Sequence, residues 1–193
     1  MNSFLLCNFA IQLIQPMKTI KVKDKEFKLS IKAEEINDVV ENIAARLNED
    51  LKGKDPLFLV VLNGAFIFAA DLYRKITIES EISFVKLASY SGTSSTSDVK
   101  ELIGLNEKLK DRTVVILEDI IDTGTTMQYL IAKLKYIGAA EVILVALLFK
   151  PSAFQENFRI DYLGMEVPND FIVGYGLDYD GFGRNHADIY KIV

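Results

Sequence analysis

One segment, residues 113–127 with the sequence TVVILEDIIDTGTTM, constrains the fold of this chain more than any other. Its apolar start, residues 114–117, is too short for a stable helix and rich in β-branched side chains, as is typical of a strand buried on both faces of a parallel sheet. Apolar residues then recur at helical spacing, at Met127, Leu130, Ile131, Leu134 and Ile137, and Gly138 is a natural helix end. The segment therefore predicts a buried strand, a polar loop and a helix, in that order.

Acidic and small side chains fill the predicted loop. They are Glu118, Asp119, Asp122, Thr123, Gly124, Thr125 and Thr126. A helix N-terminus presents unpaired N–H groups and partial positive charge, which suits a phosphate, and threonine hydroxyls can donate to phosphate oxygens. The acids would repel a bare phosphate, so they are better suited to bind sugar hydroxyls, to accept a proton or to face a ligand whose charge Mg²⁺ offsets. A phosphorylated sugar meets all of these requirements.

This segment resembles a known motif. The run LEDIIDTGTT, residues 117–126, is similar to the 5-phosphoribosyl 1-pyrophosphate (PRPP) binding motif of type I phosphoribosyltransferases, and EDIIDTG most resembles their hypoxanthine-guanine branch. The resemblance extends from about Lys18 to the C-terminus. The alternative is an ordinary strand–turn–helix with acidic turn residues. Other phosphate motifs fit less well, because the chain has no GxxxxGK[ST] and its C-terminal glycines do not open a helix as a dinucleotide fingerprint does.

The composition narrows the class of protein further. A length of 193 residues suits one domain, and the formal charge of −5 does not favour a nucleic-acid partner. The single cysteine, Cys7, excludes an internal disulfide, and a reducing cytoplasmic setting is expected. Residues 1–16 are apolar but lack a basic start and are too short to span a membrane, so we expect an N-terminal extension followed by a single domain over residues 17–193.

Strand and helix patterns alternate along the chain. A hairpin is expected over residues 18–31, a helix from about residue 33 to the breaker at Asp55-Pro56, and a second helix from the turn at residues 63–65 to about Arg74. Strands are expected at 57–62, 82–87, 113–117 and 141–149, with short strands at 160–167, 171–173 and 188–193. Such alternation predicts an α/β fold: a mostly parallel central sheet flanked by helices, with its ligands at the carboxyl ends of the strands. We expect the core at about residues 33–151 and a small hood subdomain from residues 18–32 and 152–193.

Three further places come into the site through the resemblance. Asn63 and Gly64 stand where the family has a pyrophosphate-binding loop, often with a non-proline cis peptide, although many members have a lysine where this chain has Asn63. Ser89 and Tyr90 match the Ser-Tyr pair of a lid, here within the small polar run of residues 89–98. Lys150 matches the lysine that donates to the exocyclic oxygen of a 6-oxo purine; considered alone, each of these residues would be an ordinary turn, surface loop or solvated strand end.

The C-terminal part supplies the other implied contacts. The resemblance places Phe171 in a stack on the base and the backbone of Ile172 at the hydrogen-bonding edge of the base. It assigns Asp178 to a Mg²⁺ beside the pyrophosphate, and Arg184 to the pyrophosphate itself, which a planar guanidinium can grip as a fork. The only histidine, His186, has no partner cluster in the sequence and is interpreted as structural.

The resemblance implies purine salvage by transfer of the phosphoribosyl group from PRPP to hypoxanthine or guanine, giving IMP or GMP plus pyrophosphate. In the reaction that the resemblance implies, Asp122 takes the proton of the purine, and Glu118 and Asp119 hold the ribose hydroxyls directly or through Mg²⁺. Transfer to xanthine, adenine or another base, a PRPP-sensing regulator that binds RNA, and an interaction protein with a relic pocket remain alternatives. The family also suggests a homodimer or homotetramer.

Overall fold

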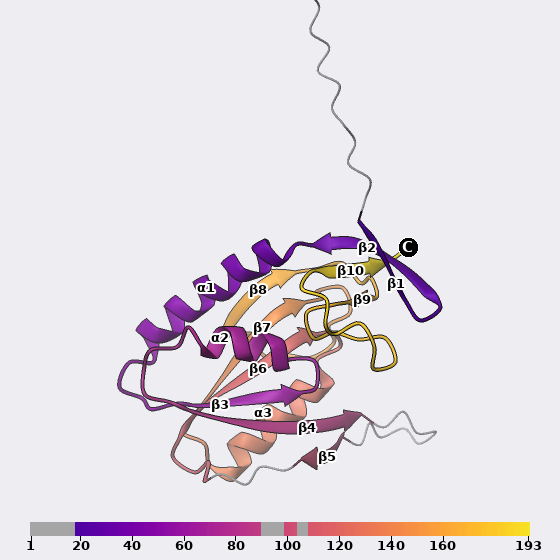
Figure 1. The fold of residues 1–193 in the computed structure, drawn as a ribbon. Coiled ribbons are helices and arrows are strands. Elements are labelled where there is room, and N and C mark those ends of the chain that lie inside the picture. The colour runs from indigo at the N-terminus through magenta and orange to yellow at the C-terminus, as the bar shows by residue number, and fades with distance from the viewer. Residues whose placement is uncertain (1–17, 90–98, 104–107) are drawn as a thin grey trace, which may run out of the picture.

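The structure, a computed structural model, describes residues 18–89, 99–103 and 108–193. A six-stranded sheet forms its centre in the order β5-β4-β3-β6-β7-β8 (Figure 1). The five parallel strands are β4 (Glu81–Ser89), β3 (Leu57–Leu62), β6 (Thr113–Ile121), β7 (Glu141–Phe149) and β8 (Tyr162–Glu166). The edge strand β5 (Val99–Ile103) runs antiparallel to β4.

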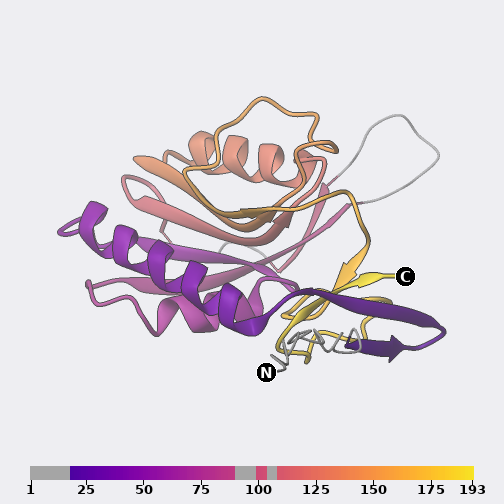
Figure 2. The same ribbon diagram turned by 90° about the horizontal axis from the view of Figure 1, so that it is seen from above.

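Helices cover both faces of this sheet, as Figure 2 shows from above. On one face α1 (Ala33–Asp50) and α2 (Phe66–Tyr73) pack on a buried cluster that includes Val115 and Leu117 of β6. On the other face α3 (Thr125–Ile137) packs on a cluster that includes Val114 and Ile116. Successive residues of a strand point to opposite faces, so β6 must be apolar at every position to bury both, and this explains its unbroken apolar run.

A second, smaller sheet forms the hood beside the end of the main sheet to which the parallel strand arrows point (Figure 1). Its four antiparallel strands lie in the order β1 (Thr19–Val22), β2 (Lys25–Ile31), β10 (Ile189–Ile192) and β9 (Ile172–Val173). Their inner faces share a small apolar core of Val22, Phe27, Val173 and Tyr190. The hood therefore joins the beginning of the described chain to its end and places both near the carboxyl ends of the parallel strands.

Most of the elements expected from the sequence are confirmed, with one correction. The hairpin, the three helices, the four core strands and the α/β class are as predicted. The boundary of the hood at residue 152 is wrong, because β8 pairs with β7 in the main sheet and the hood strands of this part begin only at β9. The extension of residues 1–16 and the lid residues 90–98 lie outside the described residues. Among the helices that the structure does describe, none is long and apolar enough to cross a membrane.

Candidate active site

The loop between β6 and α3 surrounds a small pocket. Gly124 adopts a left-handed backbone conformation with φ of 90° directly before the first turn of α3, and no side chain caps the N–H groups of that turn. The pocket has a volume of about 110 Å³, and its walls include Glu118, Asp122, Thr123 and Thr126. An uncapped helix N-terminus and two threonines beside one hollow form a site that suits a phosphate group.

Asp122 and Lys150 form an ion pair across the ends of two neighbouring strands. Lys150 follows β7 and is buried, and its Nζ donates to Asp122 Oδ2 at 3.2 Å. Asp122 lies just beyond β6, and half of its side-chain surface remains exposed. Because β6 and β7 are parallel neighbours, the fold brings these residues together from positions 28 apart in the chain. The pair therefore sets a buried cation beside a carboxylate that lines the pocket.

Glu118 has a buried oxygen that nothing in the described chain satisfies. Its Oε2 has no hydrogen-bond partner among the described residues. Burial, with a smaller contribution from the neighbouring Asp119 carboxylate, raises the pKa of Glu118 well above its ordinary value. A buried acceptor without a partner is unfavourable, so this carboxyl is suited to receive a hydroxyl or another donor from a ligand.

Asp119 lies against the loop that follows β3. A Cβ at Gly64 would overlap the Asp119 carboxylate, so only a glycine leaves room for this approach. The peptide bond between Leu62 and Asn63 is cis in the same loop. Burial raises the pKa of Asp119 to about 6, although backbone amides and the Arg184 guanidinium act in the opposite direction. The predicted pyrophosphate loop and the predicted acid are thus in direct contact.

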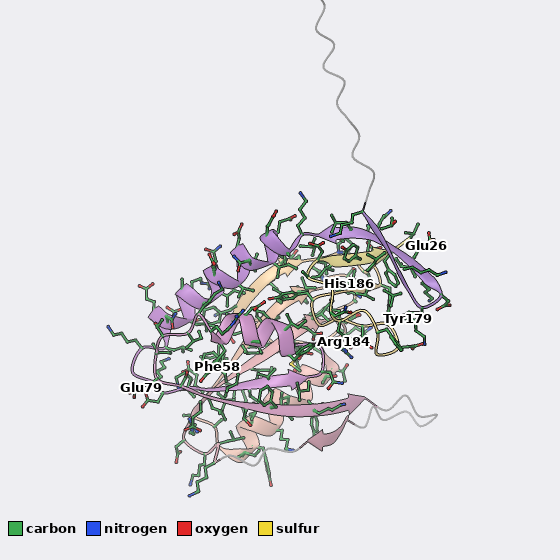
Figure 3. The ribbon with its side chains drawn as sticks, in the orientation of Figure 1. Glu26, Phe58, Glu79, Tyr179, Arg184 and His186 are labelled. Carbon is green, nitrogen blue, oxygen red and sulfur yellow. The ribbon has the colours of Figure 1, made fainter. Side chains whose placement is uncertain are left out.

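The loop between β9 and β10 brings Arg184 and Asp178 to this contact. Arg184 Nη2 lies 2.6 Å from Asp178 Oδ1, and its Nη1 donates to the carbonyl oxygen of Gly176 at 2.5 Å. A Cβ at Gly176 would in turn overlap the carbonyl oxygen of Gly64. Figure 3 shows Arg184 where the hood loop meets the main sheet. Arg184, the predicted pyrophosphate ligand, and Asp178, the predicted metal ligand, therefore lie next to the Asn63-Gly64 loop and Asp119.

Phe171 stands at the edge of the hood and is 44% exposed. Its ring centroid lies 6.3 Å from that of the buried Phe27 and 5.8 Å from that of Tyr179, so two aromatic rings support it while part of its surface stays open. Ile172 is buried in β9. His186 packs edge-on against the Tyr190 ring, which agrees with the structural role expected from the sequence.

The predicted residues thus form two adjoining groups, one around the β6–α3 loop and Lys150 and one around Gly64, Asp119 and Arg184. Ser89 ends β4, and Tyr90 lies outside the described residues. Sequence reasoning missed Glu156, which accepts a hydrogen bond from Thr125, and the Tyr175–Asp71 pair, which ties the hood loop to α2. No local pattern marks Glu156 or Asp71, since each is an ordinary acid until the fold brings its partner close. The repeated glycines around Tyr175 were the only available signal.

The acids fit Mg²⁺ in the way that ion is usually bound beside phosphates. The described residues contain no group of three or more His, Cys, Asp or Glu side chains able to hold a metal ion by themselves. Mg²⁺ typically takes one or two carboxylates and completes its shell with water and substrate phosphates. Glu118 offers a free oxygen, and Asp119 and Asp178 lie close enough for the charge of one to raise the pKa of the other. The donor set therefore suits an ion that arrives with a phosphorylated ligand.

The parallel sheet, the loop at a helix N-terminus and the acids beside it form the arrangement that the resemblance to phosphoribosyltransferases implies. The model of the phosphoribosyl transferase domain family matches residues 30–180. The hypoxanthine-guanine phosphoribosyltransferase of Bacillus subtilis is 39% identical over 82% of this chain and 88% of its own length. A hypoxanthine phosphoribosyltransferase structure from Staphylococcus aureus aligns with a TM-score of 0.82 and 31% identity, covering 86% of this chain and 90% of that one.

A longer relative matches as well. The bifunctional protein TilS/HprT of Listeria monocytogenes is 39% identical over 82% of this chain, which spans 24% of the length of that protein. The chain belongs to the phosphoribosyltransferase family, in its hypoxanthine-guanine branch.

Proposed function

We propose that this chain carries out purine salvage by transferring the 5-phosphoribosyl group from PRPP to hypoxanthine or guanine, giving IMP or GMP and releasing pyrophosphate. The observation that carries this proposal is the ion pair between the half-exposed Asp122 and the buried Lys150 at the mouth of the phosphate pocket. It sets a carboxylate and an ammonium donor beside the place where a ribose phosphate would bind. A base attacking the sugar there meets one group that can take its proton and one that can recognise its oxygen.

Each part of PRPP has a matching part of the site. The 5′-phosphate binds at residues 122–126, beside the uncapped first turn of α3 and the pocket that Thr123 and Thr126 help to line. Glu118 and Asp119 accept the ribose hydroxyls. The amides around Asn63 and Gly64, together with Arg184, receive the pyrophosphate. Positive charge develops on the ribose as the pyrophosphate leaves, and the carboxylates nearby stabilise it.

The base lies between Phe171 and the strand ends. Phe171 presents an exposed aromatic face for stacking, and the backbone of Ile172 meets the hydrogen-bonding edge of the base. Lys150 donates to the exocyclic oxygen of a 6-oxo purine, whereas adenine carries an amino donor at that position and offers the buried ammonium no acceptor there. Asp122 accepts the proton that the imidazole ring of the purine loses as its nitrogen attacks the sugar.

Magnesium is the cofactor that the donor set suits, with Asp178, Glu118 and Asp119 as its protein ligands. When bound, it neutralises the negative charge of the departing pyrophosphate. The chain contributes Arg184, whose Nη2 lies 2.6 Å from Asp178 Oδ1 and whose guanidinium binds the pyrophosphate beside the metal ligands.

We further propose a homodimer or homotetramer that works in the cytoplasm without nucleic-acid or membrane partners. Phe66 of α2 and Phe84 of β4 are each 44% exposed and are the side chains we propose to test as a contact between copies. The single cysteine suits a reducing compartment. Light scattering of the purified protein tests the assembly, and a mass equal to one chain would contradict it.

The substitution Asp122→Asn tests the function most simply, because it keeps the shape of the side chain and removes the base. General acid–base groups contribute ~10²–10⁴ in rate, so we expect turnover to fall by about that factor while PRPP still binds. Asp38→Asn, which removes an exposed acid of α1, is the matched control and should leave turnover unchanged. Near-normal turnover of Asp122→Asn would contradict the assigned role.

A further inference from the structure

The phosphate loop has a second side that faces away from its pocket. Thr123 and Thr126 line the pocket, but Thr125, the first residue of α3, does not. The Thr125 hydroxyl donates to Glu156 Oε1 at 3.1 Å, in a partly buried position, and also lies 3.4 Å from the hydroxyl of Thr123. Glu156 therefore holds the Thr125 side chain from outside the lining of the pocket, while the backbone N–H of Thr125 belongs to the first turn of α3.

Three consecutive residues after β7 contact this rear side of the loop in three different ways. The N–H of Gln155 donates to the carbonyl oxygen of Thr123 at 3.1 Å. The Phe154 ring lies so close that a Cβ at Gly124 would come within 2.6 Å of it, and Glu156 accepts the Thr125 hydroxyl. The segment 154–156 thus covers each of the loop residues 123–125 with a hydrogen bond or a packed ring.

The segment is itself fixed in place. The Phe154 ring packs edge-on against Phe149 and Phe158, with centroids 5.2 and 5.1 Å apart. Its chain begins at Lys150, which binds Asp122 at the front of the same loop. The chain from Lys150 to Glu156 therefore contacts the phosphate loop twice. Lys150 forms an ion pair with Asp122, and Glu156 accepts a hydrogen bond from Thr125.

We infer that Glu156 is a positioning residue for the 5′-phosphate: through Thr125 it holds the first turn of α3 in the conformation in which its amides converge on that group. This inference rests on the proposed function, since it assigns a role within the same site. Glu156 does not line the pocket, and its carboxylate accepts the hydrogen bond of the Thr125 hydroxyl. Its effect is transmitted by the backbone, so it should change the binding of PRPP and leave the binding of the base unchanged.

The test compares Glu156→Ala, Glu156→Gln and Thr125→Val with the wild type in steady-state phosphoribosyl transfer. Glu156→Ala removes the acceptor, and we expect the KM for PRPP to rise about tenfold while the KM for guanine stays within twofold. Glu156→Gln keeps an acceptor oxygen at the same place and should restore most of the affinity. The matched control is Glu49→Ala, an exposed acid near the end of α1, which should change neither constant.

The double variant decides whether the two side chains act as one unit. If Glu156 acts through Thr125, Glu156→Ala should add little to the rise in KM that Thr125→Val already produces. Additive effects, or an unchanged KM for PRPP in Glu156→Ala, would overturn the inference. A fall in thermal stability with no change in the KM for PRPP would show a purely structural role and would overturn it as well. If the wild type forms no nucleotide, the proposed function fails. If the wild type is active and Glu156→Ala leaves the KM for PRPP unchanged, this inference alone is refuted.

Discussion

Gly176 of the hood loop packs directly on the carbonyl oxygen of Gly64, in the loop that follows β3. A methyl group at residue 176 would overlap that oxygen, and the backbone there has φ of +99°, a region that side chains disfavour. Arg184 donates to the carbonyl oxygen of the same Gly176. The contact joins the hood to the main sheet at the place where the pyrophosphate is proposed to bind.

Gly176→Ala should therefore damage function more than stability. The left-handed backbone alone costs about 1–2 kcal/mol for a residue with a Cβ, and the overlap must also push the two loops apart. We expect the kcat/KM for PRPP to fall at least tenfold. Gly53→Ala is the matched control, because Gly53 has φ of +78° and no atom within 4 Å of an added Cβ. Urea unfolding and steady-state kinetics of both variants check this, and equal activity in the two would contradict it.

The Tyr175 hydroxyl donates to Asp71 Oδ2 at 2.8 Å, and so ties the hood loop to α2. Hydrogen bonds to charged groups contribute about 1.5–3 kcal/mol, so Tyr175→Phe should lower the free energy of unfolding by roughly that amount. Asp71 keeps its ion pair with Arg74, so it is not left without a partner. Tyr136→Phe changes a ring that is 93% exposed and should leave the stability unchanged. Chemical denaturation distinguishes the two, and a stability loss below 0.5 kcal/mol for Tyr175→Phe would show that the bond contributes little.

The raised pKa of Asp119 predicts how stability changes with pH. The unfolded chain releases this proton at the ordinary pKa of 3.8, whereas the folded protein retains it up to about pH 6. The folded state binds more protons between these values, so stability falls as pH rises through that window and stays lower above it. Deprotonation of Asp119 lowers the free energy of unfolding by at most about 3 kcal/mol. The pKa of Glu118 is raised as well, so its titration changes stability in the same direction.

Asp119→Asn removes this titration, so it should be more stable than the wild type at pH 7.5, with an advantage that shrinks toward pH 4. Urea unfolding of both proteins at pH 4.5, 6 and 7.5 measures the difference. A constant difference across this range would mean that the Asp119 pKa is not raised. The same variant should use PRPP poorly, because it removes a carboxylate proposed to hold the ribose.

Lys150 should control which base is accepted. Lys150→Met keeps the length of the buried stem and removes the ammonium, so hypoxanthine and guanine lose a charge-assisted hydrogen bond. At about 1.5–3 kcal/mol for such a bond, the kcat/KM for both bases should fall by roughly 10–100-fold. The kcat/KM for adenine should fall less, so the ratio of the kcat/KM values for guanine and adenine should become smaller. Lys52→Met, at an exposed position, is the control. Unchanged kinetics with guanine would contradict the assignment.

The sequence predicted the parts of this molecule whose signal is local. The strand, loop and helix around Asp122 lie within one short segment, so their periodicity and loop chemistry can be read from the chain. The strand pattern of β8 was also visible, but a pattern does not say which strand is the neighbour, and β8 was therefore placed in the hood. The Glu156–Thr125 and Tyr175–Asp71 bonds join residues 31 and 104 positions apart, and only the folded chain brings them together.

The most direct test of the central claim is to incubate the purified protein with PRPP and Mg²⁺, adding hypoxanthine, guanine, xanthine or adenine in turn, and to measure nucleotide and pyrophosphate. We predict IMP from hypoxanthine and GMP from guanine, each formed with one equivalent of pyrophosphate, and little AMP from adenine. Binding of PRPP without any nucleotide product would contradict catalysis and point to a PRPP-sensing protein, and preferential formation of AMP would contradict the role of Lys150.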